Sequence, residues 1–237
     1  MSNHILSVTL NHESFPTRDH YPFSLPLFNQ TNQIPFEYPV TFFVGENGTG
    51  KSTLLEAVAL ACNIHIWRNY EGTRYQYNPY EKQLCRHLTI EWANGKVPGS
   101  YFGSEIFNDF RRSLDNWAAS DPGQFKYFGG KSLLDQSHGQ SIMAFFRSRY
   151  RLKGLYFLDE PETALSPRTQ IELLEILREY GKGGQAQFII ATHSPILLAL
   201  EHSAILSFDQ SPVAPVAYEE TAHYQIYRSF LLDASRK

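Results

Sequence analysis

The feature that most constrains this sequence is a glycine-rich turn between an apolar run and a helical pattern. Residues 40–44 form a short apolar, β-rich run, and residues 45–53 read Gly-Glu-Asn-Gly-Thr-Gly-Lys-Ser-Thr. This turn matches G-x-x-x-x-G-K-[ST], in which glycines let successive backbone N–H groups point at phosphate oxygens. The helical pattern over residues 52–61 has its apolar positions at Leu54, Leu55, Val58 and Ala59. Strand, turn and helix in this order predict a phosphate-binding βα unit.

The residues of this turn have expected roles toward a nucleotide and Mg²⁺. Those predicted to bind the nucleotide are Asn47, Gly48, Thr49, Gly50, Lys51, Ser52 and Thr53. The helix that begins near Lys51 adds the positive end of its dipole. Lys51 is predicted to neutralise the β- and γ-phosphates, and the Ser52 hydroxyl to ligate Mg²⁺. A glycine-rich turn with an incidental lysine is the alternative, which the position between strand and helix disfavours.

A second apolar run, residues 155–158, ends in two acidic residues, Asp159 and Glu160. Ligands of parallel sheets bind at the carboxyl ends of the strands. Asp159 is therefore a candidate for holding Mg²⁺, and Glu160 for the general base that activates water. Two acids after a strand more often lie in a solvated loop. The phosphate-binding turn earlier in the chain favours the catalytic interpretation.

Alternating strands and helices predict an α/β fold with a largely parallel central sheet flanked by helices. Residues 188–191 are a further buried strand, and the helix before it is expected to begin at Ser166 and to end at a Gly181 C-cap. Residues 88–92 alternate and precede Asn94 and Gly95, which predicts a hairpin. We expect a single domain over residues 1–237, with residues 64–136 as an insert.

The bulk composition excludes some classes of protein. Net charge is −3, so the chain as a whole does not offer the basic field typical of nucleic-acid binding. Cys62 and Cys85 are expected to be reduced thiols. The first residues lack the pattern of a signal peptide, and the chain lacks an apolar run of roughly 20 residues. We therefore expect a cytoplasmic protein without direct membrane insertion.

Residues 137–141, Ser-His-Gly-Gln-Ser, open a further helical pattern. This segment resembles the L-S-G-G-Q signature motif of ABC ATPases, although His138 replaces the first glycine and Gln136 stands where leucine is usual. An ordinary helix N-cap is the alternative interpretation. The resemblance implies that Ser137 and Gly139 bind the γ-phosphate of ATP held by the opposite subunit, because a helix N-terminus attracts anions.

Other elements of that family follow in the family's order. Residues 161–166 resemble the D-loop, which runs along the dimer interface, and His193 resembles the switch histidine near the γ-phosphate. Glu160, His193 and Lys51 are thus the expected catalytic residues. A Q-loop glutamine is not placed. The candidates between the glycine-rich turn (residues 45–53) and the signature segment (residues 137–141) are Gln76, Gln83 and Gln124, with Glu105 as a substitute.

Nearly the whole chain resembles small stand-alone bacterial ATPases of the AAA/ABC type, in which Ser-His-Gly is the usual signature. The similar segments are residues 21–23, 40–53, 129–133, 136–141, 158–167, 188–197 and 218–224. The resemblance implies ATP and Mg²⁺ as ligands, ATP hydrolysis and a homodimer with ATP at its interface. It also implies an antiparallel β-element before Val40 and a helical insert that carries the signature.

Three functions remain open at this point. The first is a soluble ATPase that acts on a partner protein or a nucleic acid. The second is the nucleotide-binding subunit of a membrane transporter, and the third an ATP-sensing regulatory module with little turnover. Tyr21 and Phe23 are expected to pack in the core or to stack on adenine. A basic cluster after the signature helix is expected to be solvated or to contact a nucleic acid; it comprises Arg147, Arg149, Arg151 and Lys153.

Overall fold

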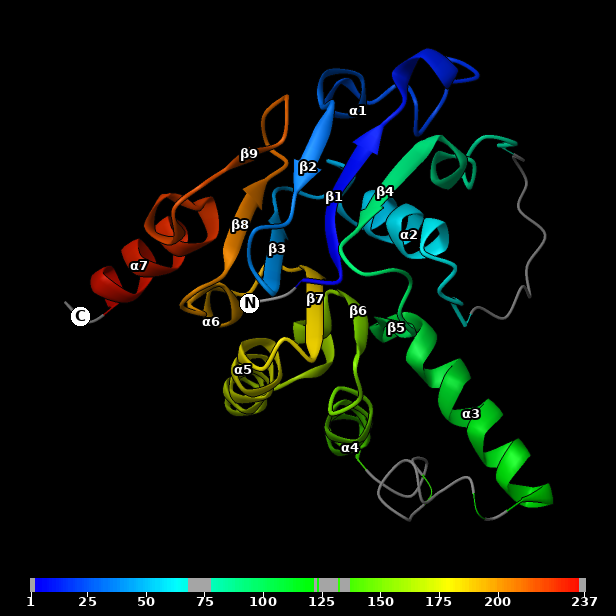
Figure 1. Cartoon of the computed structure of the whole chain (residues 1–237). Coiled ribbons are helices and arrows are strands. Elements are labelled where there is room, and N and C mark those ends of the chain that lie inside the picture. Colours follow the sequence, from blue (N-terminus) through cyan, green and yellow to red (C-terminus); the bar gives the residue numbers. More distant parts are fainter. Residues whose placement is uncertain (1–2, 68–77, 122, 124–131, 133–136, 235–237) are drawn as a thin grey trace.

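Two β-sheets and the helices around them make up the fold (Figure 1). The computed structural model describes residues 3–67, 78–121, 123, 132 and 137–234. The smaller sheet is antiparallel, with the strand order β2-β1-β4. Its strands are β1 (Ile5–Leu10), β2 (Gln33–Pro35) and β4 (Leu88–Trp92). The expected antiparallel β-element before Val40 is confirmed, and β4 joins it from later in the chain.

The larger sheet has six strands in the order β5-β6-β7-β3-β8-β9. They are β5 (Gly99–Gly103), β6 (Gly154–Asp159), β7 (Ala186–Ala191), β3 (Val40–Val44), β8 (Ala204–Ser207) and β9 (Ala214–Pro215). Every pairing is parallel except that between β8 and β9. The largely parallel sheet is therefore confirmed. The carboxyl ends of β3, β6 and β7 lie together at one edge, where a ligand is expected.

Helices cover both faces of this sheet, so its strands are apolar on both sides. Side chains of β6 alternate between two cores: Tyr156 packs with one cluster and Phe157 with the other. One cluster contains α4 (His138–Arg149), α5 (Pro167–Lys182) and α6 (Pro195–Leu198). The other contains α2 (Lys51–Ala61) and the antiparallel sheet. Further helical segments within the described residues are η1 (His12–Ser14), α1 (Pro26–Gln30), η2 (Leu84–His87), α3 (Ser104–Ser120), η4 (Pro161–Ala164), η5 (Tyr218–Glu220) and α7 (Ala222–Ala234).

A buried glutamine joins the two sheets. The Gln187 side chain on β7 is 1% exposed, and its Oε1 accepts hydrogen bonds from the backbone N–H groups of His4 and Ile5 at 2.8 and 2.9 Å. Its Nε2 donates to the Ile5 carbonyl at 3.0 Å. A buried polar group without a hydrogen-bond partner lowers the stability of the fold. These hydrogen bonds of Gln187 therefore stabilise one arrangement of the two sheets.

Two local predictions are wrong. Strand β4 does not form a hairpin with the next strand, because the chain passes from Asn94 and Gly95 to the other sheet, where β5 pairs in parallel with β6. Residues 88–92 and 99–103 of the expected insert are therefore sheet strands. Gly181 is buried within α5 and packs against Pro39 and Val40, so the C-cap is Gly183 instead.

Helices α3 and α7 lie at opposite ends of the six-stranded sheet (Figure 1). Helix α7 has no buried residue, and its large side chains Ile226, Tyr227, Phe230, Leu231 and Leu232 are all at least 51% exposed. It therefore adds little to either core. Among the described helices, none is both long and apolar enough to cross a lipid bilayer.

Candidate nucleotide-binding and catalytic site

The turn between β3 and α2 needs glycine where its backbone has a positive φ. Gly48 and Gly50 have φ values of +82° and +102°, which side chains of L-residues rarely adopt. A Cβ at Gly50 would also lie 2.9 Å from the Phe28 ring and 3.0 Å from Leu25. Helix α1 and its N-cap therefore pack against the turn. Its glycines have the left-handed backbone conformations that are typical of an anion-binding loop.

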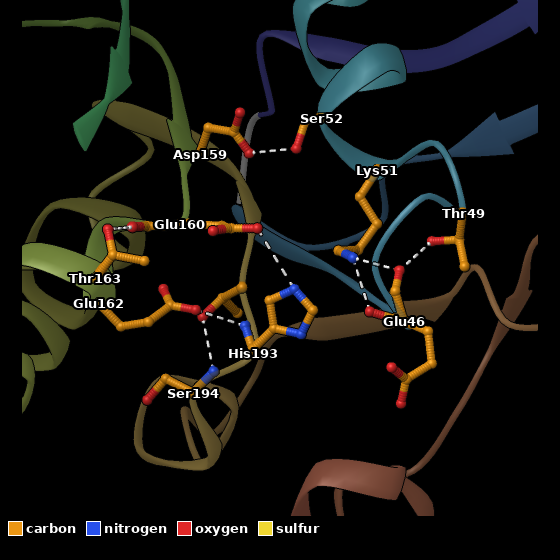
Figure 2. A network of polar contacts seen from close by, with 12 residues as sticks. Glu46, Thr49, Lys51, Ser52, Asp159, Glu160, Glu162, Thr163, His193 and Ser194 are labelled. Atoms are coloured by element: carbon orange, nitrogen blue, oxygen red, sulfur yellow. Dashed lines mark hydrogen bonds and ion pairs between the residues drawn. The ribbon is translucent and has the colours of Figure 1, made fainter. Parts of the chain in front are cut away.

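Lys51 opens α2, and its side chain is 4% exposed. Its Nζ donates to the carbonyl oxygens of Gly45 and Glu46, at 2.7 and 2.9 Å (Figure 2). Burial lowers the pKa of Lys51, while nearby carboxylates, foremost Glu160, raise it. The ammonium group is therefore held over the turn, where phosphates bind in loops of this kind.

Asp159 ends β6 beside the first turn of α2. Ser52 Oγ donates to Asp159 Oδ1 at 2.8 Å, and Tyr101 Oη donates to Asp159 Oδ2 at 2.9 Å. Burial raises the pKa of Asp159, and these two hydrogen bonds lower it. Among the described residues, no group of three or more Asp, Glu, Cys or His side chains could hold a metal ion by itself. A hydroxyl and a carboxylate fit Mg²⁺, which keeps water and phosphate oxygens as its other ligands.

Glu160 has an unusual backbone conformation, with φ +45° and ψ +54°. A non-glycine residue in this region costs on the order of 1–3 kcal/mol and occurs most often at functional sites. Its backbone N–H donates to the Ala191 carbonyl at 2.9 Å, and its carbonyl accepts from Thr163 Oγ1 at 2.8 Å. The side chain is 37% exposed. The backbone is thus fixed on both sides, while the carboxylate remains accessible to water.

His193 follows the end of β7 and points toward Glu160 (Figure 2). Its Nε2 lies 3.5 Å from Glu160 Oε1, and its Nδ1 lies 2.8 Å from Nε2 of His223. Burial, together with the charges of Lys51 and His223, lowers the pKa of His193 to about 4. His193 is therefore neutral near neutral pH, so each of its ring nitrogens has one role, donor or acceptor.

The lowered pKa of His193 predicts a pH dependence of stability. Between pH 6.5 and about 4 the unfolded chain binds more protons at this residue than the folded chain does. The contribution of neutral His193 to stability is thus fully present above pH 6.5. Acidification from pH 6.5 to about 4 is expected to lower the free energy of unfolding. Urea denaturation at about pH 7 and about pH 5 measures the loss, which should be smaller in His193→Gln. An equal loss in both proteins would contradict the prediction.

Glu162, in the expected D-loop, fixes the position of His193. Its Oε1 accepts the backbone N–H of His193 at 2.6 Å, and burial raises the pKa of Glu162. Asp209, after β8, similarly accepts the backbone N–H of Glu46 at 2.7 Å. Neither residue, nor Tyr101, was identified as a site residue from sequence patterns. Each is a polar residue within three positions of the carboxyl end of a strand, which is the signal that could have found them.

The signature residues open α4. Ser137 is the N-cap: its Oγ accepts from the Gln140 N–H at 3.4 Å, and Gln140 Oε1 accepts from the Ser137 N–H at 3.2 Å. His138 Nδ1 is 3.1 Å from Arg111 Nη1 on α3, so the residue that replaces glycine joins the two helices. Ser137 and Gly139 line a surface hollow of about 800 Å³ between α4 and α5, and none of its described lining residues belongs to the turn 45–53.

Other predicted site residues differ in their surroundings. Phe23 is fully buried, which confirms core packing, whereas Tyr21 is 39% exposed and its hydroxyl contacts that of Thr53. Core packing is therefore wrong for Tyr21. Asn47 is exposed, and Thr49 Oγ1 donates to the Glu46 carbonyl at 2.9 Å.

The Q-loop stays without a placed residue. Gln83 Nε2 donates to the Pro79 carbonyl at 2.9 Å. Gln76 and Gln124, the side chain of Glu105, Gln136 and most of residues 129–133 lie outside the described part of the chain. Tyr101, from the strand before Glu105, contacts the carboxylate expected to hold the metal, as Ser52 does.

The expected basic cluster is partly engaged in the fold. Arg147 forms an ion pair with Glu172 at 2.9 Å, and Arg149 Nη2 donates to the Gly99 carbonyl at 3.1 Å. The Arg147 side chain is 61% exposed, as expected of a solvated helix end.

Known families and relatives match parts of this chain. Residues 132–199 match the model described as "AAA domain, putative AbiEii toxin, Type IV TA system", and residues 24–75 match an "AAA domain" model. The iron(3+)-hydroxamate import ATP-binding protein FhuC of Bacillus subtilis is 22% identical over 71% of this chain and 66% of its own length. The ferric enterobactin transport ATP-binding protein FepC of Escherichia coli is 27% identical over 65% and 62%. This chain thus spans slightly less than two thirds of these relatives.

Solved structures show the same fold. CbiO1 from Clostridium perfringens, part of the ABC transporter complex CbiONQ, has a TM-score of 0.51 and 18% identity, covering 97% of this chain and 96% of its own. An Smc head bound to the C-terminal winged-helix domain of ScpA has a TM-score of 0.51 and 13% identity, covering 92% and 98%. One architecture thus occurs in a part of a transporter complex and in an Smc head.

Proposed function

Because this chain is a P-loop ATPase of the ABC type, we propose that two copies close head to tail around two ATP·Mg²⁺ and that hydrolysis reopens them. The observation that carries the proposal is the separation of two half-sites within one chain. Lys51, Ser52, Asp159, Glu160 and His193 lie together, whereas Ser137 and Gly139 line a different hollow. A second copy is needed to bring a signature helix to the phosphates.

Each group of the first half-site has a role in this reaction. The backbone of residues 47–50 and Lys51 bind the phosphates, and Ser52 and Asp159 would hold Mg²⁺. Mg²⁺ supplies charge that offsets the negative charge on the transferred phosphoryl group. Glu160 accepts a proton from the attacking water, and His193 donates a hydrogen bond from Nε2 to the γ-phosphate. The geometry that supports these roles is the 3.5 Å separation of Glu160 Oε1 and His193 Nε2.

The second half-site acts through the N-terminus of α4. The unpaired N–H groups of the first helical turn and the Ser137 hydroxyl are donors for an anion. Ser137 is exposed, and Gly139 leaves open space apart from the Ala164 carbonyl, which is 3.7 Å from where a Cβ would stand. Gly139 therefore places no side chain of its own between a phosphate of the other copy and this helix N-terminus.

Mixing two inactive variants tests the shared site. Lys51→Ala damages the first half-site. Ser137→Asp keeps an N-cap that stabilises α4 but places a negative charge against the γ-phosphate. Each variant alone is expected to be inactive. A mixed dimer has one composite site with both defects and one intact site, so an equal mixture should regain about a quarter of the wild-type rate.

The outcome separates a shared site from a self-contained one. Activity that appears only on mixing requires residues from two chains at one ATP. If the mixture stays as inactive as its components, while each variant remains folded by circular dichroism, the head-to-tail proposal is wrong. If Ser137→Asp alone retains full activity, the signature helix does not contact the phosphate.

The effector of this switch is proposed to be a partner protein, with a nucleic acid as the alternative, in the cytoplasm. The import ATP-binding relatives favour a second candidate, the nucleotide-binding subunit of a membrane transporter. Pull-down of the intact chain with and without ATP distinguishes the candidates. A multi-span membrane protein in the eluate would favour the transporter role.

A further inference from the structure

The first turn of α7 reaches the catalytic site. His223 is the second residue of this helix, and its Nε2 lies 2.8 Å from Nδ1 of His193. The two ring centroids are 4.9 Å apart at an angle of 67°, so the rings meet edge to face. The opposite ring nitrogen of His193, Nε2, is buried and has no hydrogen-bond partner among the described residues.

We propose that His223 is a positioning residue for ATP hydrolysis: by donating from Nε2 to His193 Nδ1, it keeps the proton of His193 on Nε2. This inference rests on the proposed role of His193. Only with its proton on Nε2 can a neutral His193 donate a hydrogen bond to a phosphate oxygen, which accepts but cannot donate. The residue acts through another side chain and does not itself touch the substrate.

The surroundings select this arrangement of the proton. Burial lowers the pKa of both histidines, so the pair is neutral and shares one hydrogen bond. If His193 donated from Nδ1 instead, its Nε2 would present a lone pair toward Glu160 Oε1, 3.5 Å away. Two acceptors facing each other repel, whereas an Nε2–H group is attracted to the carboxylate.

The base of α7 is fixed to the segment that carries His193. Tyr218 Oη donates to the Pro195 carbonyl at 3.0 Å, and Thr221 Oγ1 donates to the Tyr218 carbonyl at 2.7 Å. Thr221 also accepts the backbone N–H of Tyr224 at 3.3 Å, which caps the helix. His223 is therefore held in place by the contacts of its neighbours, while the rest of α7 is exposed.

Two substitutions separate the hydrogen bond from the shape of the ring. His223→Phe keeps a planar ring but removes the donor, and we expect kcat to fall by about 10- to 100-fold. KM for ATP should stay near the wild-type value, because the turn and Lys51 are unchanged. His223→Gln places an amide N–H close to the position of Nε2 and should restore most of kcat. Tyr227→Phe, on the exposed part of α7, is the matched control.

His193→Phe provides the reference for interpreting these rates. If it lowers kcat strongly and His223→Phe adds no further loss in the double variant, the two residues act as one unit. A wild-type kcat in His223→Phe, or equal losses in Phe and Gln variants of unchanged melting temperature, would overturn the role of His223 alone. An unchanged kcat in His193→Phe would instead overturn the proposed catalytic role of His193.

Discussion

Replacing Glu160 with glutamine is expected to lower kcat for ATP hydrolysis by about 10²- to 10⁴-fold while leaving ATP bound. Glutamine has the same shape and keeps an acceptor oxygen near His193 Nε2, but it cannot take a proton from water. The surrounding hydrogen bonds come from the Glu160 backbone, so the substitution preserves them. ATP should therefore accumulate in the closed dimer instead of being turned over.

Sizing chromatography with ATP and Mg²⁺ measures this accumulation. The Glu160→Gln variant should elute as a dimer with ATP and as a smaller species without it, and released phosphate should be near background. Glu201→Gln, on an exposed turn, is the control for loss of one negative charge. A variant that remains monomeric with saturating ATP and Mg²⁺ would contradict the head-to-tail dimer, whatever its hydrolysis rate.

Replacing Lys51 with alanine is expected to weaken ATP binding and to lower the hydrolysis rate by about 10²- to 10³-fold. The ammonium group is nearly fully buried and fixed by two carbonyl oxygens of the turn, so its charge is already positioned for the phosphates. Preorganised charge of this kind stabilises a transition state without a further cost of reorganisation. Nearby carboxylates would then face the phosphates without this compensating charge.

A phosphate-release assay and equilibrium binding of a fluorescent ATP analogue measure the two effects separately. Lys182→Ala, at the exposed end of α5, is the control for loss of a lysine. Removal of Nζ also takes a hydrogen-bond donor from the Gly45 and Glu46 carbonyls, so the melting temperature must be compared. Equal rates in wild type and Lys51→Ala at matched stability would remove the assignment of hydrolysis to this site.

The phosphate-binding half-site follows from local sequence. Residues 45–53 combine glycines, a lysine and a serine in one continuous turn, so the backbone geometry and the side chains are specified together. Asp159 and Glu160 could be placed because a buried strand delivers whatever follows it to the carboxyl edge of the sheet. The N-cap at Ser166 and the strands β3, β6 and β7 were predictable for the same reason, since their signals span only a few adjacent residues.

Which strand pairs with the residues after Asn94 and Gly95 could not be predicted from the sequence. Asn94 and Gly95 are a typical hairpin-turn sequence, yet Gly99–Gly103 (β5) pairs with Leu155–Asp159 of β6, because its apolar side chains are buried there. Because this pairing was not predicted, the contact between the Tyr101 hydroxyl and Asp159 was not predicted either, since it requires β5 and β6 to be adjacent. Pairing across the sheet depends on which surfaces bury together, and a local pattern does not encode that.

The sequence by itself determined the phosphate-binding turn, the two acids and the α/β class, because each depends on neighbours along the chain. Only the tertiary structure decided how residues far apart meet: Tyr101 with Asp159, Glu162 with His193, and His223 with His193. It also showed that Ser137 and Gly139 line a hollow apart from the turn that contains Lys51. The physical reason is that hydrogen bonds act over about 3 Å, and only packing of the sheets and helices brings distant residues that close.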